Sequence, residues 1–294
     1  MRVKVAASDR STLARPYNTG PFVRSPHVRN DDVEIFAIGT ELVTGLILDT
    51  NSHWIAGEVA VAGGDVRRIT ALADDFDALT GELRAAVDRR ARVIITTGGL
   101  GPTPDDLTVE AVSALAGCGV HTPREVLEDY ARRRGISLEE ASSPPRLKMG
   151  TVPAAARVHL NPVGWAPCFM VQVEDSSIWC MPGPPREVQG CFSAHIQPVV
   201  ERLFAGQSAR LRVFIDAHES ETSPLMQSVM RRIPSAYLKA YVGMSNPEGL
   251  PVDIVVRSTD GAAPNELLQQ AYDEFCAVAA ASGKTVTLEA PAAS

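Results

Sequence analysis

Short apolar runs alternate with longer amphipathic segments along the first two-thirds of the chain. Val33–Ile38 and Val93–Thr97 are too short for helices and are mainly apolar, as expected of strands that are buried in a parallel sheet. Val66–Leu72 predicts a further strand. Apolar residues repeat at helical spacing in the segments after these strands, and the predicted helices cover residues 54–62, 76–91 and 107–116.

Strands that alternate with helices of this length predict βαβ units and a mainly parallel sheet, that is, an α/β fold. Ligands of such sheets bind beyond the carboxyl ends of the strands. The loops at residues 39–49, 74–75 and 98–106 all follow predicted strands. We therefore expect these loops to open on one edge of the sheet.

The middle of the chain predicts a helical, strongly charged segment and then a return to the sheet. Residues 123–150 carry many charges, which favours a solvent-facing surface. Residues 169–173 and 177–181 predict a hairpin within the sheet. The prolines and glycine that follow lead into a predicted helix over residues 188–204 and supply a fourth loop for the same edge.

From about Gly206 the pattern changes to strand, helix, strand, strand, helix, which is most of a split βαβ sandwich. Residues 284–294 have the character of a frayed tail, and residues 1–31 lack any apolar period and are expected to be a mobile extension. The predicted organisation is an extension over 1–31, an α/β domain over 32–205, a small α+β domain over 206–283 and a tail over 284–294.

The composition is that of a soluble globular protein, with 45% hydrophobic and 21% charged residues. No apolar run approaches the length that spans a bilayer. Five cysteines in no CxxC pair favour reduced thiols and a cytoplasmic location. The net charge is −7, and residues 1–30 contribute +5 through six Arg and Lys against one Asp, so the remainder carries −12. An acidic body argues against nucleic-acid binding.

The candidate chemistry centres on a glycine-rich turn that links the strand Val93–Thr97 to the following helix. Gly98, Gly99 and Gly101 permit positive φ and a close approach of a ligand to the backbone. The N-terminus of the helix offers free N–H groups and a positive dipole end. This stretch contains neither a Walker A loop nor a GxGxxG fingerprint. It predicts a phosphate site of another kind.

A helix cap is the competing interpretation of the same turn. Thr103 fits an N-cap, Pro104 the first helical position and Asp106 the acid of a capping box. Asp105 and Asp106 would then complement the helix dipole without any ligand. This interpretation leaves the three glycines unexplained. Two carboxylates beside a phosphate need a cation between them, and Mg²⁺ uses one or two carboxylates plus phosphates in this way.

Four motifs, in order, resemble the N-terminal part of the competence/damage-inducible protein A (CinA) family, a domain type shared with the MoaB/Mog molybdopterin adenylyltransferases. The motifs are Gly39-Thr40-Glu41-Leu42 with Asp49-Thr50-Asn51, Thr97-Gly98-Gly99-Leu100-Gly101-Pro102-Thr103 with Asp105-Asp106-Leu107-Thr108, Asn161-Pro162-Val163-Gly164 with Ala166-Pro167, and Pro182-Gly183 with Pro185 and Glu187. The sequence stops where longer members continue into a nicotinamide-nucleotide amidase domain, so the resemblance implies no amidase activity here.

The resemblance implies a three-layer α/β/α fold, a homo-oligomer (dimer or trimer) and a nucleotide or pterin ligand. In the CinA family this domain is linked to metal-dependent hydrolysis of ADP-ribose-type pyrophosphates. Glu41, Asp105 and Asp106 are the candidate catalytic residues, and the two aspartates are the candidate ligands of Mg²⁺ or a similar cation. The candidate ligand-binding residues are Gly39, Thr40, Asn51, Thr97, Gly98, Gly99, Leu100, Gly101, Thr103, Thr108, Gly183, Pro185 and Glu187.

Three functions stay open at this point. The first is a nucleotide-pyrophosphate-binding protein that hydrolyses its ligand. The second is a protein of molybdenum cofactor biosynthesis that binds molybdopterin or transfers an adenylyl group to it. The third is a non-catalytic regulator that keeps the fold and its binding site.

Overall fold

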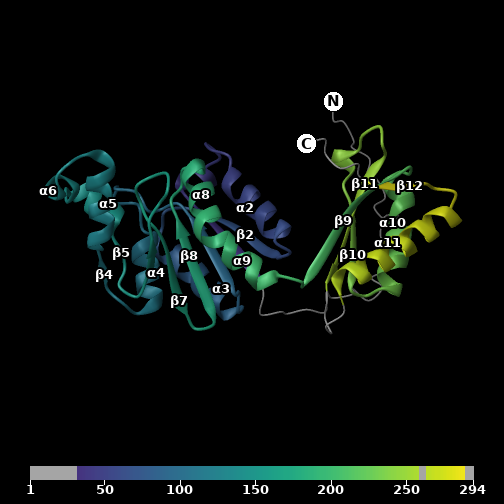
Figure 1. The fold of residues 1–294 in the computed structure, drawn as a ribbon, viewed down its shortest axis with the longest axis horizontal. Coiled ribbons are helices and arrows are strands. Elements are labelled where there is room, and N and C mark those ends of the chain that lie inside the picture. Colours follow the sequence, from purple (N-terminus) through teal and green to yellow (C-terminus); the bar gives the residue numbers. More distant parts are fainter. Residues whose placement is uncertain (1–31, 258–262, 289–294) are drawn as a thin grey trace, which may run out of the picture.

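The protein is described here from a computed structural model, which defines residues 32–257 and 263–288 (Figure 1). The predicted extension over 1–31 and residues 289–294 of the predicted tail lie outside these residues. No helix in the described ranges is long and apolar enough to cross a bilayer.

The first sheet has six strands in the order β2-β1-β3-β8-β7-β6. The four neighbours from β2 to β8 run parallel, whereas β7 and β6 are antiparallel to their neighbours. The predicted mainly parallel sheet and its hairpin are therefore confirmed. The strands are β1 (Val33–Ile38), β2 (Val66–Leu72), β3 (Val93–Thr97), β6 (Arg157–His159), β7 (Cys168–Val173) and β8 (Ser176–Met181).

Helices cover both faces of this sheet, which confirms the three-layer α/β/α arrangement. One apolar core joins Ile35 and Ile95 of the sheet to Ile55 and Phe192 of one helical layer. The other core packs the opposite sheet face against α3 and α4. The first layer contains α2 (Thr50–Val61), α8 (Pro185–Cys191), a π-helical turn (Phe192–Ile196) and α9 (Gln197–Phe204), and the second contains α3 (Phe76–Asp88) and α4 (Thr108–Ala116).

The segment between α4 and β6 forms a lobe of short elements. Val126 and Tyr130 are about 1% exposed and pack with Trp165, because the helix that carries them has one apolar face. The charged residues Glu125, Glu128, Arg132 and Arg134 are exposed, as predicted for a solvent-facing surface. The prediction is wrong for Asp129, which is buried and forms ion pairs with Arg132 and Arg133. The lobe contains β4 (Val120–His121), α5 (Arg124–Arg134), α6 (Leu138–Ala141), α7 (Pro144–Gly150) and β5 (Val152–Pro153).

A second, antiparallel sheet in the order β10-β11-β9-β12 is packed on α10 and α11 (Figure 1). The predicted tail is wrong at Val286–Leu288, which forms β12 beside β9 because Val286 packs on this domain's core. This strand completes the split βαβ pattern. The elements are β9 (Ser208–Ile215), α10 (Glu219–Arg232), β10 (Ala236–Ala240), a 3₁₀ turn (Val242–Met244), β11 (Leu250–Arg257), α11 (Pro264–Ala281) and β12 (Val286–Leu288).

Candidate functional site

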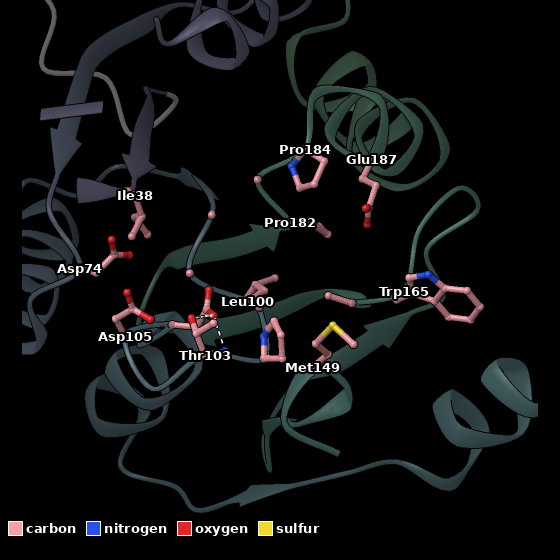
Figure 2. A pocket seen from close by; sticks show the side chains of 18 of the residues that line it. Ile38, Asp74, Leu100, Thr103, Asp105, Met149, Trp165, Pro182, Pro184 and Glu187 are labelled. Atoms are coloured by element: carbon pink, nitrogen blue, oxygen red, sulfur yellow. Dashed lines mark hydrogen bonds between the residues drawn. The ribbon is translucent and has the colours of Figure 1, made fainter. Parts of the chain in front are cut away.

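A cavity of about 410 Å³ lies beyond the carboxyl ends of the parallel strands. The loops after β1, β2, β3 and β8 all contribute to it, as expected for strand ends that share one edge. Figure 2 shows Asp74 and Asp105 at one end of the cavity and Met149, Trp165 and Glu187 at the other. Eleven of the predicted site residues line it: Gly39, Glu41, Gly98, Gly99, Leu100, Gly101, Thr103, Asp105, Asp106, Gly183 and Glu187.

The glycine loop needs its glycines for backbone reasons. Gly98 and Gly99 have φ of +99° and +66°. A Cβ on Gly98 would lie 2.1 Å from the carbonyl oxygen of Ile38, and one on Gly99 would lie 2.1 Å from Thr108 Oγ1. The buried Thr108 hydroxyl in turn donates to the Gly98 carbonyl at 2.9 Å. The loop is therefore packed against β1 and the start of α4, where larger residues do not fit.

This loop presents free backbone donors. Within the described part of the chain, the N–H groups of Gly99, Leu100 and Gly101 have no protein acceptor. The N–H groups of their neighbours Gly98 and Thr103 donate to Met181 O and Asp106 Oδ2. Successive backbone N–H groups of this kind occur in known anion-binding sites, so this loop is the candidate anion site.

The predicted cap of α4 is wrong. The helix begins at Thr108, with Leu107 at the N-cap position and no side-chain cap. Asp106 instead closes a separate turn, because its Oδ2 accepts hydrogen bonds from the N–H of Thr103 at 2.8 Å and from the Thr103 hydroxyl at 2.5 Å. Asp105 lies within that turn, exposed and at the cavity. Hydrogen bonding from Thr103 and from its own backbone lowers the pKa of the Asp105 carboxyl, and the Lys148 ammonium adds to this effect.

A second acidic pair comes from the loops after β1 and β2. Asp74 Oδ2 accepts from the N–H of Thr40 at 2.8 Å and from the Thr40 hydroxyl at 3.0 Å. Thr40 begins α1 (Thr40–Val43), which also carries Glu41. The Glu41 carboxylate lies over Gly39, where a Cβ would be 2.5 Å from Glu41 Oε1. The bond between the two loops therefore fixes the start of the helix from which Glu41 reaches the cavity.

Glu187 is held at the other end by a buried asparagine. Asn161 Nδ2 donates to Glu187 Oε2 at 2.6 Å and to the Ala166 carbonyl at 3.0 Å, while its Oδ1 accepts from the N–H groups of Val163 and Gly164. A Cβ on Gly164 would lie 1.7 Å from Glu187 Oε2. This loop and Glu187 thus form one hydrogen-bonded unit.

Five predicted site residues do not line the cavity. Asn51 Nδ2 donates to the Gly183 carbonyl at 2.8 Å and so supports a lining residue from behind. Thr40 and Thr108 make the contacts described above. Thr97 is buried at the end of β3, and Pro185 is the exposed first residue of α8.

The structure adds several residues to the site. Asp74 lies in a loop that was expected at this edge but was not among the candidate site residues, whereas Met149 and Trp165 line the cavity and Lys148 bonds to the loop beneath it without any such expectation. Trp165 lies with its ring edge-on to Tyr130 and beneath the guanidinium groups of Arg133 and Arg134, at 4.8 and 4.2 Å. The turn-rich loop around Trp165 is recognisable in the sequence and marked this region as a candidate. The contact of Trp165 with the charged lobe depends on long-range packing and is not recognisable there.

The acidic side chains that line the cavity suit a cation that is bound partly by the protein and partly by a ligand. The charged residues that line the cavity are all acidic, and neither Lys nor Arg is among the described lining residues. In the described ranges, no three or more His, Cys, Asp or Glu side chains are grouped closely enough to hold a metal alone. Asp105 and Asp106 fit the pattern of Mg²⁺, which takes one or two carboxylates and completes its shell with phosphate and water.

Comparison with known proteins places this geometry in context. Residues 34–202 match the family described as "Probable molybdopterin binding domain". A Pyrobaculum calidifontis protein is 34% identical over 225 residues, which cover 74% of this chain and 82% of that protein. A CinA-like protein of Citrifermentans bemidjiense is 31% identical over 255 residues, which cover 83% of this chain and 57% of that protein.

A solved structure agrees with the sequence comparisons. The crystal structure of the protein CinA from Thermoplasma acidophilum is 28% identical and has a TM-score of 0.53. The match covers 58% of this chain and 99% of that chain. The predicted resemblance to CinA-like proteins is therefore confirmed.

Proposed function

The chain belongs to the molybdopterin-binding domain family, and on that premise we propose that it binds a nucleotide pyrophosphate with a divalent cation and hydrolyses it. The observation that carries the proposal is the pairing of unused backbone donors with carboxylates in one cavity. Gly99, Leu100 and Gly101 offer N–H groups to an anion, while Asp105 and Asp106 stand beside them. An anionic ligand is stable in such an acidic cavity when a cation lies between it and the carboxylates.

Each part of the cavity has a distinct role in this proposal. The glycine-loop N–H groups hold the pyrophosphate, and Asp105 and Asp106 hold the cation. When bound, the cation supplies Lewis-acid polarisation of the phosphate and a more acidic water. Glu41, which reaches the cavity from the neighbouring strand end, accepts a proton from the attacking water. Asp74 fixes the start of the Glu41 helix through Thr40.

The second candidate is molybdopterin binding, with or without adenylyl transfer. The family description of residues 34–202 favours it, and a pterin pyrophosphate or adenylate presents the same anionic group to the glycine loop. The two candidates therefore share the anion site and differ in the rest of the ligand. Mass spectrometry of ligand that co-purifies with the protein distinguishes a nucleotide from a pterin.

The decisive experiment measures the hydrolysis of ADP-ribose in the presence of Mg²⁺, Mn²⁺ or Co²⁺. Calorimetry of the same protein measures the binding of ADP-ribose and AMP. Cation-dependent release of AMP supports the hydrolase. Tight binding without turnover of any pyrophosphate favours the non-catalytic regulator, and absence of binding to ADP-ribose and AMP overturns the first proposal. Light scattering tests the predicted dimer or trimer in the same samples.

A further inference from the structure

The turn that carries Asp105 and Asp106 is held from outside the cavity by Lys148. This residue lies in the last turn of α7, and its Nζ donates to the backbone carbonyl oxygen of Asp106 at 2.9 Å. The same ammonium contacts Glu110 Oε1 on α4 at 3.2 Å. Met149, the next residue, lines the cavity. The end of α7 therefore reaches the site through two successive residues.

Asp106 is fixed at three points by this arrangement. Its carboxylate accepts hydrogen bonds from the N–H and the hydroxyl of Thr103. Its N–H donates to the Thr103 carbonyl at 3.2 Å, and its own carbonyl accepts a hydrogen bond from Lys148. The first two contacts are local to the turn. Among the hydrogen bonds of the described residues, the bond from Lys148 is the one that links the 103–106 turn to another element, 42 residues away in sequence. This bond, together with the contact between Gly101 and the Asp106 carboxylate, sets the orientation of the turn relative to the glycine loop.

The charge of Lys148 matters as well as its hydrogen bond. The carboxylates that line the cavity repel one another, and none of the described lining residues is Lys or Arg. Lys148 is 29% exposed and places its ammonium directly under the lining turn. A charge-assisted bond to a backbone carbonyl is stronger than a neutral one.

We propose that Lys148 is a positioning residue that ties α7 to the 103–106 turn and so sets Asp105 and Asp106 for cation and pyrophosphate binding. It acts through the backbone of Asp106, since Nζ bonds a carbonyl oxygen and Lys148 does not line the cavity. The inference rests on the proposed function for the ligand. The tether itself belongs to the free protein and is measurable without any ligand.

Three variants test the proposal. Lys148→Met keeps an unbranched side chain and removes the ammonium. Lys148→Arg restores a positive donor. Arg146→Met is the matched control, because Arg146 lies on the same helix and donates to the Glu140 carbonyl and, at 3.4 Å, to Ser143 Oγ, away from the turn.

Two readouts are made on each full-length variant. Amide hydrogen exchange of the free protein at Thr103 and Asp106 reports the tether. Calorimetry of ADP-ribose with Mn²⁺ reports the affinity of the site. We expect Lys148→Met to exchange faster at these amides and to bind about 10-fold more weakly, the effect of losing one charge-assisted bond.

The outcomes separate this inference from the proposed function. Partial recovery by Lys148→Arg, with Arg146→Met unchanged, supports the positioning role. Unchanged exchange in Lys148→Met overturns the tether whatever the ligand. Unchanged affinity in that variant, with a wild-type protein that binds, overturns the role of Lys148 in the site. A wild-type protein that binds neither Mn²⁺ nor ADP-ribose overturns the proposed function, and exchange then still decides the tether.

Discussion

A single carboxylate oxygen of Asp106, Oδ2, accepts hydrogen bonds from both the backbone N–H and the hydroxyl of Thr103. Oδ1 has no hydrogen-bond partner among the described residues. Gly101 lies directly against this carboxylate, and a Cβ there would be 2.5 Å from Oδ2. One oxygen of Asp106 thus maintains the turn while the other is available at the cavity.

Replacement of this carboxylate separates its two uses. In Asp106→Asn the amide oxygen can still accept from Thr103, so we expect a stability loss of only about 1 kcal/mol in denaturant unfolding. Cation-dependent turnover should fall on the order of 100-fold, the scale of losing one electrostatic contact in a catalytic site. Nucleotide binding without metal should not weaken, because a repulsive charge has gone. A mutant that is slightly less stable but fully active would leave Asp106 as a structural residue only.

Because Gly99 lies in tight contact with Thr108, we expect a side chain at position 99 to lower the stability by more than the positive φ alone would. Gly99→Ala brings a Cβ within 2.1 Å of Thr108 Oγ1 at φ of +66°. Gly117→Ala is the matched control, since Gly117 has φ of +64° with open space around it. The control should lose about 1–2 kcal/mol. Gly99→Ala should lose more in urea unfolding and bind ADP-ribose more weakly, and equal losses would show that the clash relaxes freely.

Asn161 is expected to be a strong determinant of stability. It is 3% exposed, and its side chain contacts four partners, among them Glu187. Asn161→Ala leaves these groups without their partner and should cost about 3 kcal/mol or more. Asn246→Ala, which removes a similar turn bond in an exposed loop, should cost about 1 kcal/mol or less. Urea unfolding of both variants checks this difference, and equal costs would contradict it.

The imidazole of His159 predicts a stability loss at mildly acidic pH. Its ring is stacked between Trp179, at 5.4 Å, and His195, at 4.8 Å, and its buried Nε2 has no partner in the described residues. Desolvation, the nearby His195 and Arg157 lower the pKa of His159 below 6.5. The unfolded chain therefore binds the proton first, so stability is retained above pH 6.5 and falls as the pH drops towards the folded pKa.

Removal of the titrating ring tests this effect. His159→Phe keeps an aromatic ring against Trp179 and cannot be protonated. We expect the fall in melting temperature between pH 7.5 and 5.5 to be smaller in His159→Phe than in the wild-type protein. Parallel falls in both proteins would assign the acid sensitivity to other groups.

The apolar pattern alone determined most of the fold and the location of the site. Val33–Ile38, Val66–Leu72 and Val93–Thr97 were predicted as strands and have those bounds in the structure. Because parallel strands present their carboxyl ends at one edge, Gly39, Asp74 and Gly98 had to meet there. Glycine's tolerance of positive φ likewise indicated the backbone geometry at Gly98 and Gly99, whereas Gly101 has no positive φ and instead leaves room for the Asp106 carboxylate.

Tertiary structure decided what local rules left open. Thr103, Pro104 and Asp106 satisfy a helix-cap pattern, but the chain uses Asp106 to close a turn and begins α4 only at Thr108. The pattern is shared by caps and turns, and packing of the glycine loop against Thr108 selects between them. Val286–Leu288 is too short to signal a strand alone and gains its structure from pairing with β9.

The contacts of Trp165 and Lys148 could not be predicted from the sequence for the same reason. Arg134 lies over Trp165 and Lys148 reaches Asp106 only because the lobe of α5–α7 folds back onto the sheet edge. Sequence periodicity reports which face of an element is apolar and carries no register between elements far apart in the chain. The sequence thus determined the layers, the edge and the glycine loop that we propose as the anion site. Long-range packing decided which side chains surround that site, because those contacts depend on where distant elements come to rest.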